Sequence, residues 1–405
     1  MSVPTRRSIV EDALARANGI LRLEPAWVAR DFLPPGRRLG LPDSAYALGE
    51  RGWVSERWLG STTKADNRIG PPEEGLSYLA LDSERMTLKE AVEVAGDLIM
   101  GAEYARTHKG LGRLAKIYDF AARLPYHLHQ RQNDARLVGR NSKEEAYYFP
   151  EGVDLGPHPE TFFGVHPSIV ENKQYDILLR YLVEWKNDLI LRHSRAYLLV
   201  PGEGFHLPAG GLHAPGTALT IELQEDSDVF AFLQALVAGK IISKDLLFKD
   251  VRKEDRNQLG ERAVLNQVDW ELNGDPYFYE NRHTSPQVVD NTRQEGGEER
   301  WIYYNTTKFS GKRLVVKSGG KFVSLDKGVY NILVWRGKGH FDSQEVVGGD
   351  SLRDELLITH GRATSPLTVE NTGADDLVII KFFGPDINTD IPMIPHYGNW
   401  QGARQ

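Results

Sequence analysis

The chain has 405 residues, 49 basic side chains of lysine and arginine against 56 acidic ones, a net charge of −7, and no cysteine. Its length suggests two or three domains, and 40% hydrophobic residues indicate a soluble globular protein rather than a disordered, collagen-like or disulfide-rich chain. The lack of cysteine excludes thiolate zinc sites and iron–sulfur clusters, and the acidic balance without a basic tract argues against nucleic-acid binding.

The first part of the chain is predicted to be a short helix followed by an irregular arm, together residues 1–40. Residues 8–17 are amphipathic, and the Pro- and Gly-rich stretch after them breaks regular structure. A stronger helix is predicted for 87–107, where Thr87 and Glu90 form a capping box ahead of apolar residues at helical spacing.

Short β-strands dominate the region that follows. Aromatic or alternating runs, bounded by Gly, Pro, Asn and Asp, fill residues 113–225 and are interrupted by one predicted helix near 171–191. We therefore assign residues 41–225 to one β domain that carries both inserted helices.

A second β domain is predicted at the C-terminal end. Residues 226–275 are polar and charged apart from an apolar run at 229–239 with helical spacing, and we interpret them as a helical connector. In 276–405 strand-like runs alternate with turn residues about every eight to twelve positions, which is typical of a β-sandwich or barrel. The Pro- and Gly-rich tail from residue 388 is expected to lie over a neighbouring domain.

No segment approaches the length of an apolar membrane span, and the N-terminal residues lack the apolar core of a signal peptide. We therefore expect a cytoplasmic protein with no membrane partner. The sequence leaves open whether it is a monomer or a homodimer.

The segment Tyr126-His127-Leu128-His129 is the most informative one for function. Residues two apart in a strand point to the same face, so the imidazoles of His127 and His129 should converge inside a β-barrel. Paired histidines at this spacing are a metal-ligand pattern, although two surface histidines on one strand would give the same sequence.

Two further residues can complete a metal site. Glu145 begins the next aromatic-rich strand, and His213 lies in a strand followed by a Pro/Gly turn. Three imidazoles and one carboxylate leave one or two coordination positions open, which is typical of a catalytic metal. Glu160 also opens a strand and competes with Glu145 for the carboxylate position. His206 lies an odd number of residues before His213 and is interpreted as structural.

Several blocks of this region resemble, in order, the type I mannose-6-phosphate isomerases, which are zinc enzymes of two cupin domains with a helical insertion. The blocks are Glu56-Arg57-Trp58-Leu59-Gly60-Ser61, Leu114-Ala115-Lys116-Ile117-Tyr118-Asp119, Tyr126 to His129, Lys143-Glu144-Glu145-Ala146-Tyr147-Tyr148, Pro201-Gly202-Glu203, Pro208-Ala209-Gly210 with His213-Ala214, and Ile221-Glu222-Leu223-Gln224 with Ser227-Asp228. The resemblance covers residues 50–230. It implies a mainly β fold with helical additions, built of two cupin domains (jelly-roll β-barrels) and a helical connector.

The resemblance also implies one divalent metal ion, zinc first, with manganese or iron as alternatives. The expected metal ligands are His127, His129, Glu145 and His213. We assign catalytic roles to Lys143, Lys116 and Asp228, and substrate binding to Glu56, Trp58, Glu222 and Arg282. His340 and His360 stand alone in the C-terminal domain, so we expect that domain to hold no metal.

Three departures from the family pattern bear on the substrate. Pro125 stands where the family has a serine associated with substrate phosphate, and Phe232 stands where it has an arginine. Neither side chain can donate a hydrogen bond to phosphate. His127 replaces a glutamine, which gives a set of three histidines and one glutamate that elsewhere in the cupins also holds iron or manganese. We consider Arg282, at the entry to the C-terminal domain, as a replacement for the missing arginine.

The resulting expectation is a metal-dependent aldose–ketose isomerase that acts on a small carbohydrate, phosphorylated or not. Such a reaction moves a proton between adjacent carbons through an enediolate stabilised by the metal. The alternatives are another metal-cupin enzyme, such as an iron or manganese oxygenase, an epimerase or a lyase, and a non-catalytic sugar-binding protein.

Overall fold

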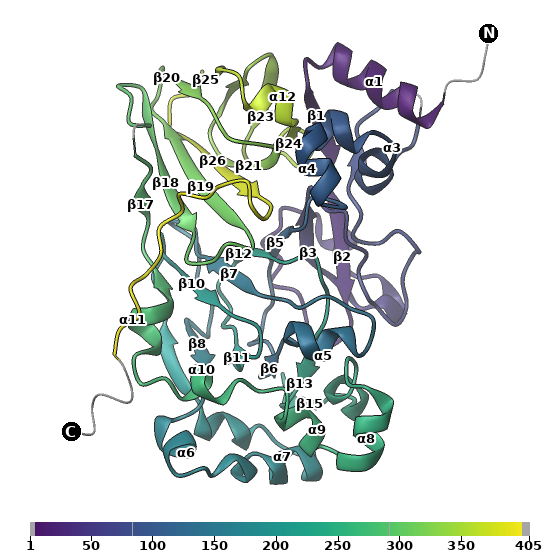
Figure 1. Ribbon diagram of the computed structural model, residues 1–405, viewed down its shortest axis with the longest axis vertical. Coiled ribbons are helices and arrows are strands. Elements are labelled where there is room, and N and C mark those ends of the chain that lie inside the picture. Colours follow the sequence, from purple (N-terminus) through teal and green to yellow (C-terminus); the bar gives the residue numbers. More distant parts are fainter. Residues whose placement is uncertain (1–4, 83, 291, 399–405) are drawn as a thin grey trace.

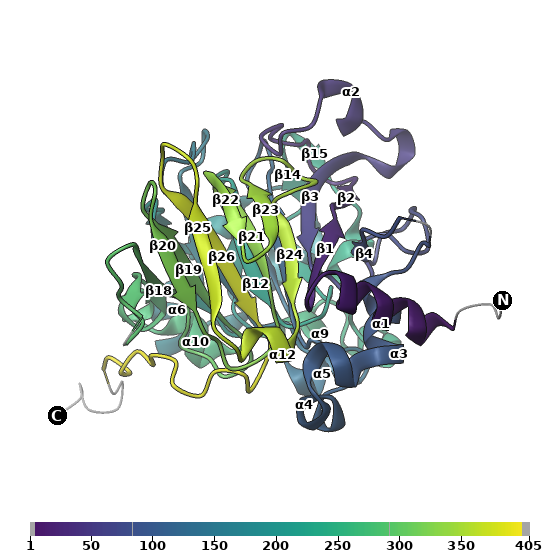
Figure 2. The same cartoon turned by 90° about the horizontal axis from the view of Figure 1, so that it is seen from above.

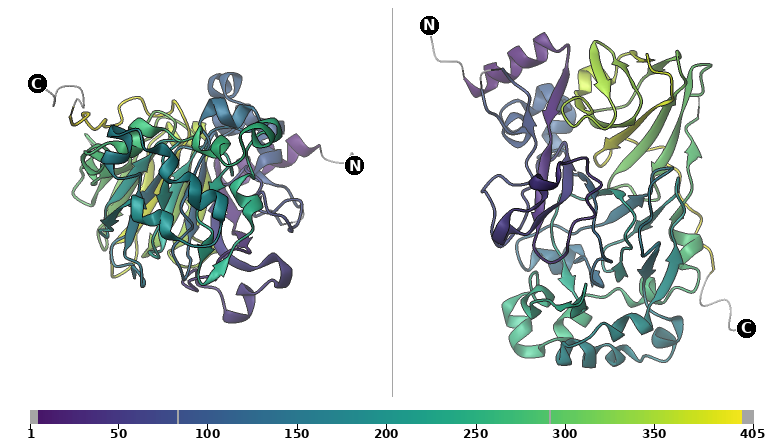
Figure 3. Two further views of the ribbon diagram at one scale, coloured as in Figure 1. Left: turned by 90° about the horizontal axis from the view of Figure 1, so that it is seen from below. Right: turned by 180° about the vertical axis from the view of Figure 1, so that it is seen from behind.

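The computed structural model describes residues 5–82, 84–290 and 292–398, so residues 399–405 of the predicted tail lie outside the described part. Two β domains are stacked along the long axis, and short helices cover the lower end of the first one (Figures 1 and 3). None of the described helices is long and apolar enough to span a membrane.

The first β domain consists of two facing antiparallel sheets. The larger has the strand order β16-β10-β7-β12-β5-β3-β2 and the smaller the order β13-β6-β11-β8-β9. The larger contains β2 (Ala26–Arg30), β3 (Trp53–Leu59), β5 (Leu114–Tyr118), β7 (Glu145–Tyr148), β10 (Gly204–Leu207), β12 (Thr220–Gln224) and β16 (His283–Thr284). The smaller contains β6 (His127–Leu128), β8 (Glu160–Phe163), β9 (Arg195–Leu198), β11 (His213–Ala214) and β13 (Ala231–Phe232). Tyr147 and Phe205 of the larger sheet pack with Phe163 of the smaller, so the aromatic residues that favour strands also form the core between the sheets.

The second β domain is also made of two antiparallel sheets. Its larger sheet has the order β17-β18-β19-β26-β21-β24-β1-β4 and its smaller one β20-β25-β22-β23 (Figure 2). The larger contains β1 (Ile20–Glu24), β4 (Tyr78–Leu79), β17 (Gln287–Val288), β18 (Gly297–Tyr303), β19 (Ser310–Val316), β21 (Tyr330–Arg336), β24 (Glu355–Ile358) and β26 (Leu377–Phe383). The smaller contains β20 (Lys321–Ser324), β22 (Lys338–Phe341), β23 (Gln344–Val347) and β25 (Leu367–Asn371). Exposed and buried residues alternate along β20, as the two-residue period of a half-buried strand requires.

The helices are short. They are α1 (Arg6–Arg16), α2 (Asp43–Tyr46), α3 (Leu88–Met100), α4 (Ala102–Thr107), α5 (Gln132–Arg136), α6 (Pro167–Glu171), α7 (Leu179–Glu184), α8 (Lys253–Leu259), α9 (Arg262–Leu265), α10 (Trp270–Gly274), α11 (Phe278–Arg282) and α12 (His360–Ala363). Single 3₁₀ turns are η1 (Gly49–Arg51), η2 (Tyr175–Ile177), η3 (Leu189–His193) and η4 (Lys244–Leu247). The single helix predicted near 171–191 is instead a series of short ones, interrupted at Lys173 and Trp185, which both have positive φ.

The helices of residues 88–107 pack on the second β domain, which corrects their assignment to the first. The Thr87 side chain caps α3 by accepting a hydrogen bond from the backbone N–H of Glu90 at 3.1 Å, as the capping box predicts. The apolar face of α3, with Leu88 and Ala91, lies in the same core as Leu356 of β24. The helical period identified this face, but only the tertiary structure shows which sheet it covers.

The N-terminal arm is more regular than predicted, because residues 20–30 form two strands. β1 pairs with β24, placing Ile20 opposite Ile358, and β2 pairs with β3, placing Val28 opposite Glu56. The arm therefore extends a sheet in each domain and links them. It also places Arg30, at the end of β2, at the site described below.

The connector is also corrected by the structure. Part of the apolar run 229–239, predicted as a helical face, forms β13, and β14 (Leu236–Val237) pairs with β15 (Lys240–Ile241). β13 pairs with β6 and sets Phe232 opposite His127. An apolar run this short suits a buried strand as well as a helix, and pairing with β6 decides between them.

Candidate metal centre

Three buried histidines meet between the sheets of the first β domain. His127 lies in β6, His129 follows that strand, and His213 lies opposite His127 in the neighbouring strand β11. One ring nitrogen of each lies within 4.8 Å of those of the other two. Because 6% or less of each side chain is exposed, the cluster is shielded from bulk water.

The backbone fixes the tautomer of each imidazole. Nδ1–H of His127 donates to the carbonyl of Pro125 and that of His129 to the carbonyl of Val229, both at 2.6 Å, while His213 donates to Gly211 at 3.0 Å. A carbonyl oxygen can only accept, so each Nδ1 carries the proton and each Nε2 presents a lone pair. This arrangement orients metal-ligating histidines.

Glu145 of β7 faces two of these lone pairs. Its Oε1 lies 3.0 Å from Nε2 of His213, and its Oε2 lies 3.0 Å from Nε2 of His129. These contacts bring acceptor atoms together, and Nε2 of His213 has no hydrogen-bond donor among the described residues. A cation between the groups would satisfy all of these atoms, so the residues present fit a divalent metal.

The charge states suit the same role. Burial and the neighbouring imidazoles lower the pKa of His127 well below its usual value, and burial and Lys143 lower the pKa of His129 to about 3. Burial by itself raises the pKa of Glu145, but Lys143 and the histidines outweigh it and hold the pKa well below its usual value. Neutral imidazoles and an ionised carboxylate are the forms that bind metal.

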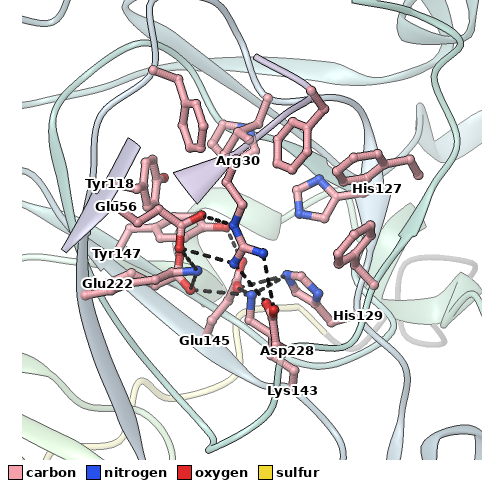
Figure 4. A pocket seen from close by; sticks show the side chains of 17 residues that line it. Arg30, Glu56, Tyr118, His127, His129, Lys143, Glu145, Tyr147, Glu222 and Asp228 are labelled. Carbon is pink, nitrogen blue, oxygen red and sulfur yellow. Dashed lines mark hydrogen bonds and ion pairs between the residues drawn. The ribbon is translucent and has the colours of Figure 1, made fainter. Parts of the chain in front are cut away.

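A chain of charged side chains continues from Glu145. Nζ of Lys143 lies 3.0 Å from Oε2 of Glu145 and from Nε2 of His129, and 3.5 Å from Glu222. Glu222 in turn is 3.1 Å from Nζ of Lys116. All of these side chains line one cavity, so the predicted catalytic lysines and Glu222 do lie beside the histidines (Figure 4).

Arg30 was not predicted as a site residue and lines this cavity. Its guanidinium contacts Glu56 at 2.8 Å and Asp228 at 3.2 Å, and 4% of the residue is exposed (Figure 4). Burial by itself raises the pKa of both carboxyl groups, but Arg30 outweighs it and lowers both. The signal for it in the sequence is a charged residue at the end of the run Ala26–Arg30, within the segment predicted to be an irregular arm.

Two predicted substrate-binding residues lie elsewhere. Trp58 is fully buried behind the cavity, where its Nε1–H donates to Glu56 at 2.7 Å, so it positions that carboxylate. Arg282 lines a separate depression with Asp269 and Asp275 and does not replace a missing arginine. Neither side chain lines the cavity, because aromatic or basic character in the sequence does not reveal how far a side chain lies from a site.

Contacts also place Glu160 and His206, the two remaining alternatives. Glu160 is paired with Arg123 and does not line the cavity, which favours Glu145 as the carboxylate beside the histidines. His206 is buried, and its Nε2 lies 2.9 Å from Glu144, in agreement with a structural role.

No family model matches the sequence, and no curated protein matches it either. Solved structures do match. A mannose 6-phosphate isomerase from Bacillus subtilis has 15% identity and a TM-score of 0.56 and covers 90% of this chain and 99% of its own. A phosphomannose isomerase variant from Salmonella typhimurium has 12% identity and a TM-score of 0.59. A zinc-bound mannose 6-phosphate isomerase has 13% identity and a TM-score of 0.58. Each alignment covers 91% of this chain and 100% of the other chain. The chain therefore shares the two-domain cupin fold of these enzymes, which confirms the predicted fold class.

Proposed function

We propose that this protein is a metal-dependent aldose–ketose isomerase acting on a small carbohydrate. The observation that carries the proposal is the convergence of three buried Nε2 lone pairs and the Glu145 carboxylate beside a cavity that two lysines line. The shared fold with zinc-bound mannose 6-phosphate isomerase supports it.

The proposed ligands are His127, His129, His213 and Glu145, with zinc as the first expectation. When bound, a divalent ion there stabilises negative charge on substrate oxygens while a neighbouring carbon loses its proton. Two of these proposed ligands, His129 and His213, each have Nε2 3.0 Å from an oxygen of the Glu145 carboxylate.

Lys143 is the side chain we assign to proton transfer. Its Nζ is buried within 3.0 Å of Glu145 and His129, so it lies beside the proposed metal position. Glu222, 3.5 Å away, can take the proton that Lys143 must lose before it acts as a base, and Lys116 holds Glu222 in place. The proton removed from one substrate carbon then returns to the adjacent carbon, and a hydroxyl proton crosses to the former carbonyl oxygen, so no redox partner is needed.

The direct test measures metal and product together. We expect purified protein to hold about one equivalent of divalent metal and to convert an aldose, tested as mannose and its 6-phosphate among other sugars, into the ketose. A chelator should abolish the conversion, and the added metal should restore it, because charge stabilisation depends on the ion. Turnover that persists after all metal has been removed would contradict the proposal.

A substitution can distinguish the proposed role of Lys143 in proton transfer from the role of the metal ligands. Lys143→Gln should lower kcat by about 10²- to 10⁴-fold while metal content stays at the wild-type level, since a general base is lost and no proposed ligand is. The matched control is Lys308→Gln, because Lys308 pairs with Glu225 at 2.9 Å and does not line the cavity. An unchanged kcat in Lys143→Gln would remove Lys143 from the mechanism.

A second function is favoured by one observation, the third imidazole supplied by His127. Three histidines and one glutamate also suit iron or manganese, and thus an oxygenase or another metal-cupin reaction. Metal identification and oxygen consumption distinguish the two, because an enzyme that works with redox-inactive zinc and consumes no oxygen is not an oxygenase.

A further inference from the structure

We propose that the substrate is an uncharged, unphosphorylated monosaccharide whose end remote from the metal lies against a wall of phenyl rings. The wall consists of Phe32, Phe120, Phe230 and Phe232, which we call the phenyl wall. The inference rests on the proposed isomerase function and specifies its substrate class.

The phenyl wall begins directly beside the histidines. Phe232 lies opposite His127 in the β13–β6 pair, and their ring centroids are 5.6 Å apart. From Phe232 the wall continues to Phe230 at 4.5 Å and to Phe32 at 5.2 Å, and from there to Phe120 at 5.9 Å. A sugar held at the metal position therefore meets aromatic rings next to it.

The cations that line the cavity already have carboxylate partners. Arg30 is held by Glu56 and Asp228. Lys116 contacts Glu222, and Lys143 contacts both Glu145 and Glu222. The lining thus has three cations against four carboxylates, a formal charge of 3 − 4 = −1, which one divalent ion changes to +1.

A phosphate monoester does not suit a cavity whose cations are already paired with carboxylates. It carries about −1.5 to −2 charges at neutral pH and needs donors or cations around its three oxygens. Each lining cation already faces a buried carboxylate, and drawing it towards a phosphate would weaken that pairing, which is unfavourable in a buried site. Lys249, with its Nζ 4.3 Å from the Phe230 ring centroid, is held by Asp66 at 2.9 Å and Asp250 at 3.1 Å.

An uncharged sugar end fits the phenyl wall better. Its C–H groups can pack on aromatic faces, while the hydroxyl groups near the metal reach the charged side chains. Such a substrate loses less hydration on entering than a phosphate ester does, because removing water from a hydroxyl costs far less than removing it from a charged group. The expected class is therefore an aldose whose terminal carbon carries hydroxyl or hydrogen.

Binding of non-reacting analogues tests the inference without turnover. With zinc-loaded protein, the hexitols mannitol, glucitol and galactitol are compared by calorimetry with the corresponding 6-phosphates and with inorganic phosphate. We expect at least one hexitol to bind at least ten times more tightly than its 6-phosphate. Tighter binding of the phosphate ester, or no binding of any hexitol, would overturn the inference.

Turnover separates this inference from the proposed function. A free aldose converted with a kcat/KM at least ten times that of its 6-phosphate supports both. Preferential conversion of the phosphate ester leaves the isomerase proposal standing and overturns the substrate class. Selective hexitol binding without conversion of any sugar supports the substrate class and contradicts the isomerase proposal.

A substitution in the phenyl wall gives the sharpest result. Phe232→Arg supplies a cation without a carboxylate partner. The affinity for a hexitol 6-phosphate, divided by the affinity for the free hexitol, should therefore rise at least tenfold. Phe232→Leu, the matched control, keeps an apolar side chain and should leave that ratio within twofold of wild type. An unchanged ratio in Phe232→Arg, or a phosphate preference in Phe232→Leu, would overturn the inference; the second variant decides alone if the first does not fold.

Discussion

Replacing His129 with alanine should remove metal and activity together. The variant lacks one of three Nε2 lone pairs and the acceptor that Nζ of Lys143 contacts at 3.0 Å. Even the loss of a group that only supports a metal ligand costs about 10- to 100-fold in affinity, so losing a ligand should cost at least about 100-fold. Elemental analysis after dialysis should find well under one equivalent of metal, and ketose formation should fall below detection.

The control for this experiment is His340→Ala. His340 is exposed in β22 of the second β domain, so its loss should change neither metal content nor rate. Circular dichroism of both variants checks that the fold is retained. A His129→Ala protein that keeps a full equivalent of metal and wild-type activity would refute the proposed centre.

The largest effect on stability is expected in the second β domain, from Lys381→Met. Lys381 is fully buried, and its Nζ contacts Asp326 at 2.7 Å, Ser324 at 2.6 Å and Glu299. Lys312 completes the network with Asp326 at 2.7 Å. The network joins β26 and β18 to the segment that follows β20 and thus links the two sheets.

Removing one charge from this balanced set leaves a buried carboxylate uncompensated. Breaking a buried ion pair from one side costs about 3–5 kcal/mol, so the free energy of unfolding measured with urea should fall by that amount. The matched control is Lys317→Met, an exposed lysine 3.0 Å from Asp376, which should cost at most about 1 kcal/mol. Equal losses in the two variants would contradict the assigned role of the network.

The pH dependence of this effect has a definite sign. Burial by itself raises the pKa of Asp326, but Lys381 and Lys312 outweigh it and hold the pKa below its usual value. Its contribution is therefore complete above its unfolded pKa of about 3.9 and is lost as the pH falls further. The stability difference between wild type and Lys381→Met should consequently shrink in acid, measured by urea unfolding at a series of pH values.

The sequence by itself determined the features that depend on local pattern. Aromatic or alternating runs identified strands within residues 113–225 and 276–383, the Thr87–Glu90 pair identified the start of α3, and the His127–His129 spacing identified a cluster on one strand face. Each of these signals depends on residues a few positions apart, which is the range over which strand and helix periods act.

Only the tertiary structure decided which distant segments meet. Pairing of β2 with β3 brings Arg30 to Asp228, 198 residues away, and pairing of β13 with β6 sets Phe232 beside His127. The same folding places Arg282 at a separate depression and Trp58 behind Glu56, so neither lines the cavity. Local periodicity gives the face of an element but not its neighbour, and the balance of charge and apolar surface around the metal position depends on the neighbour.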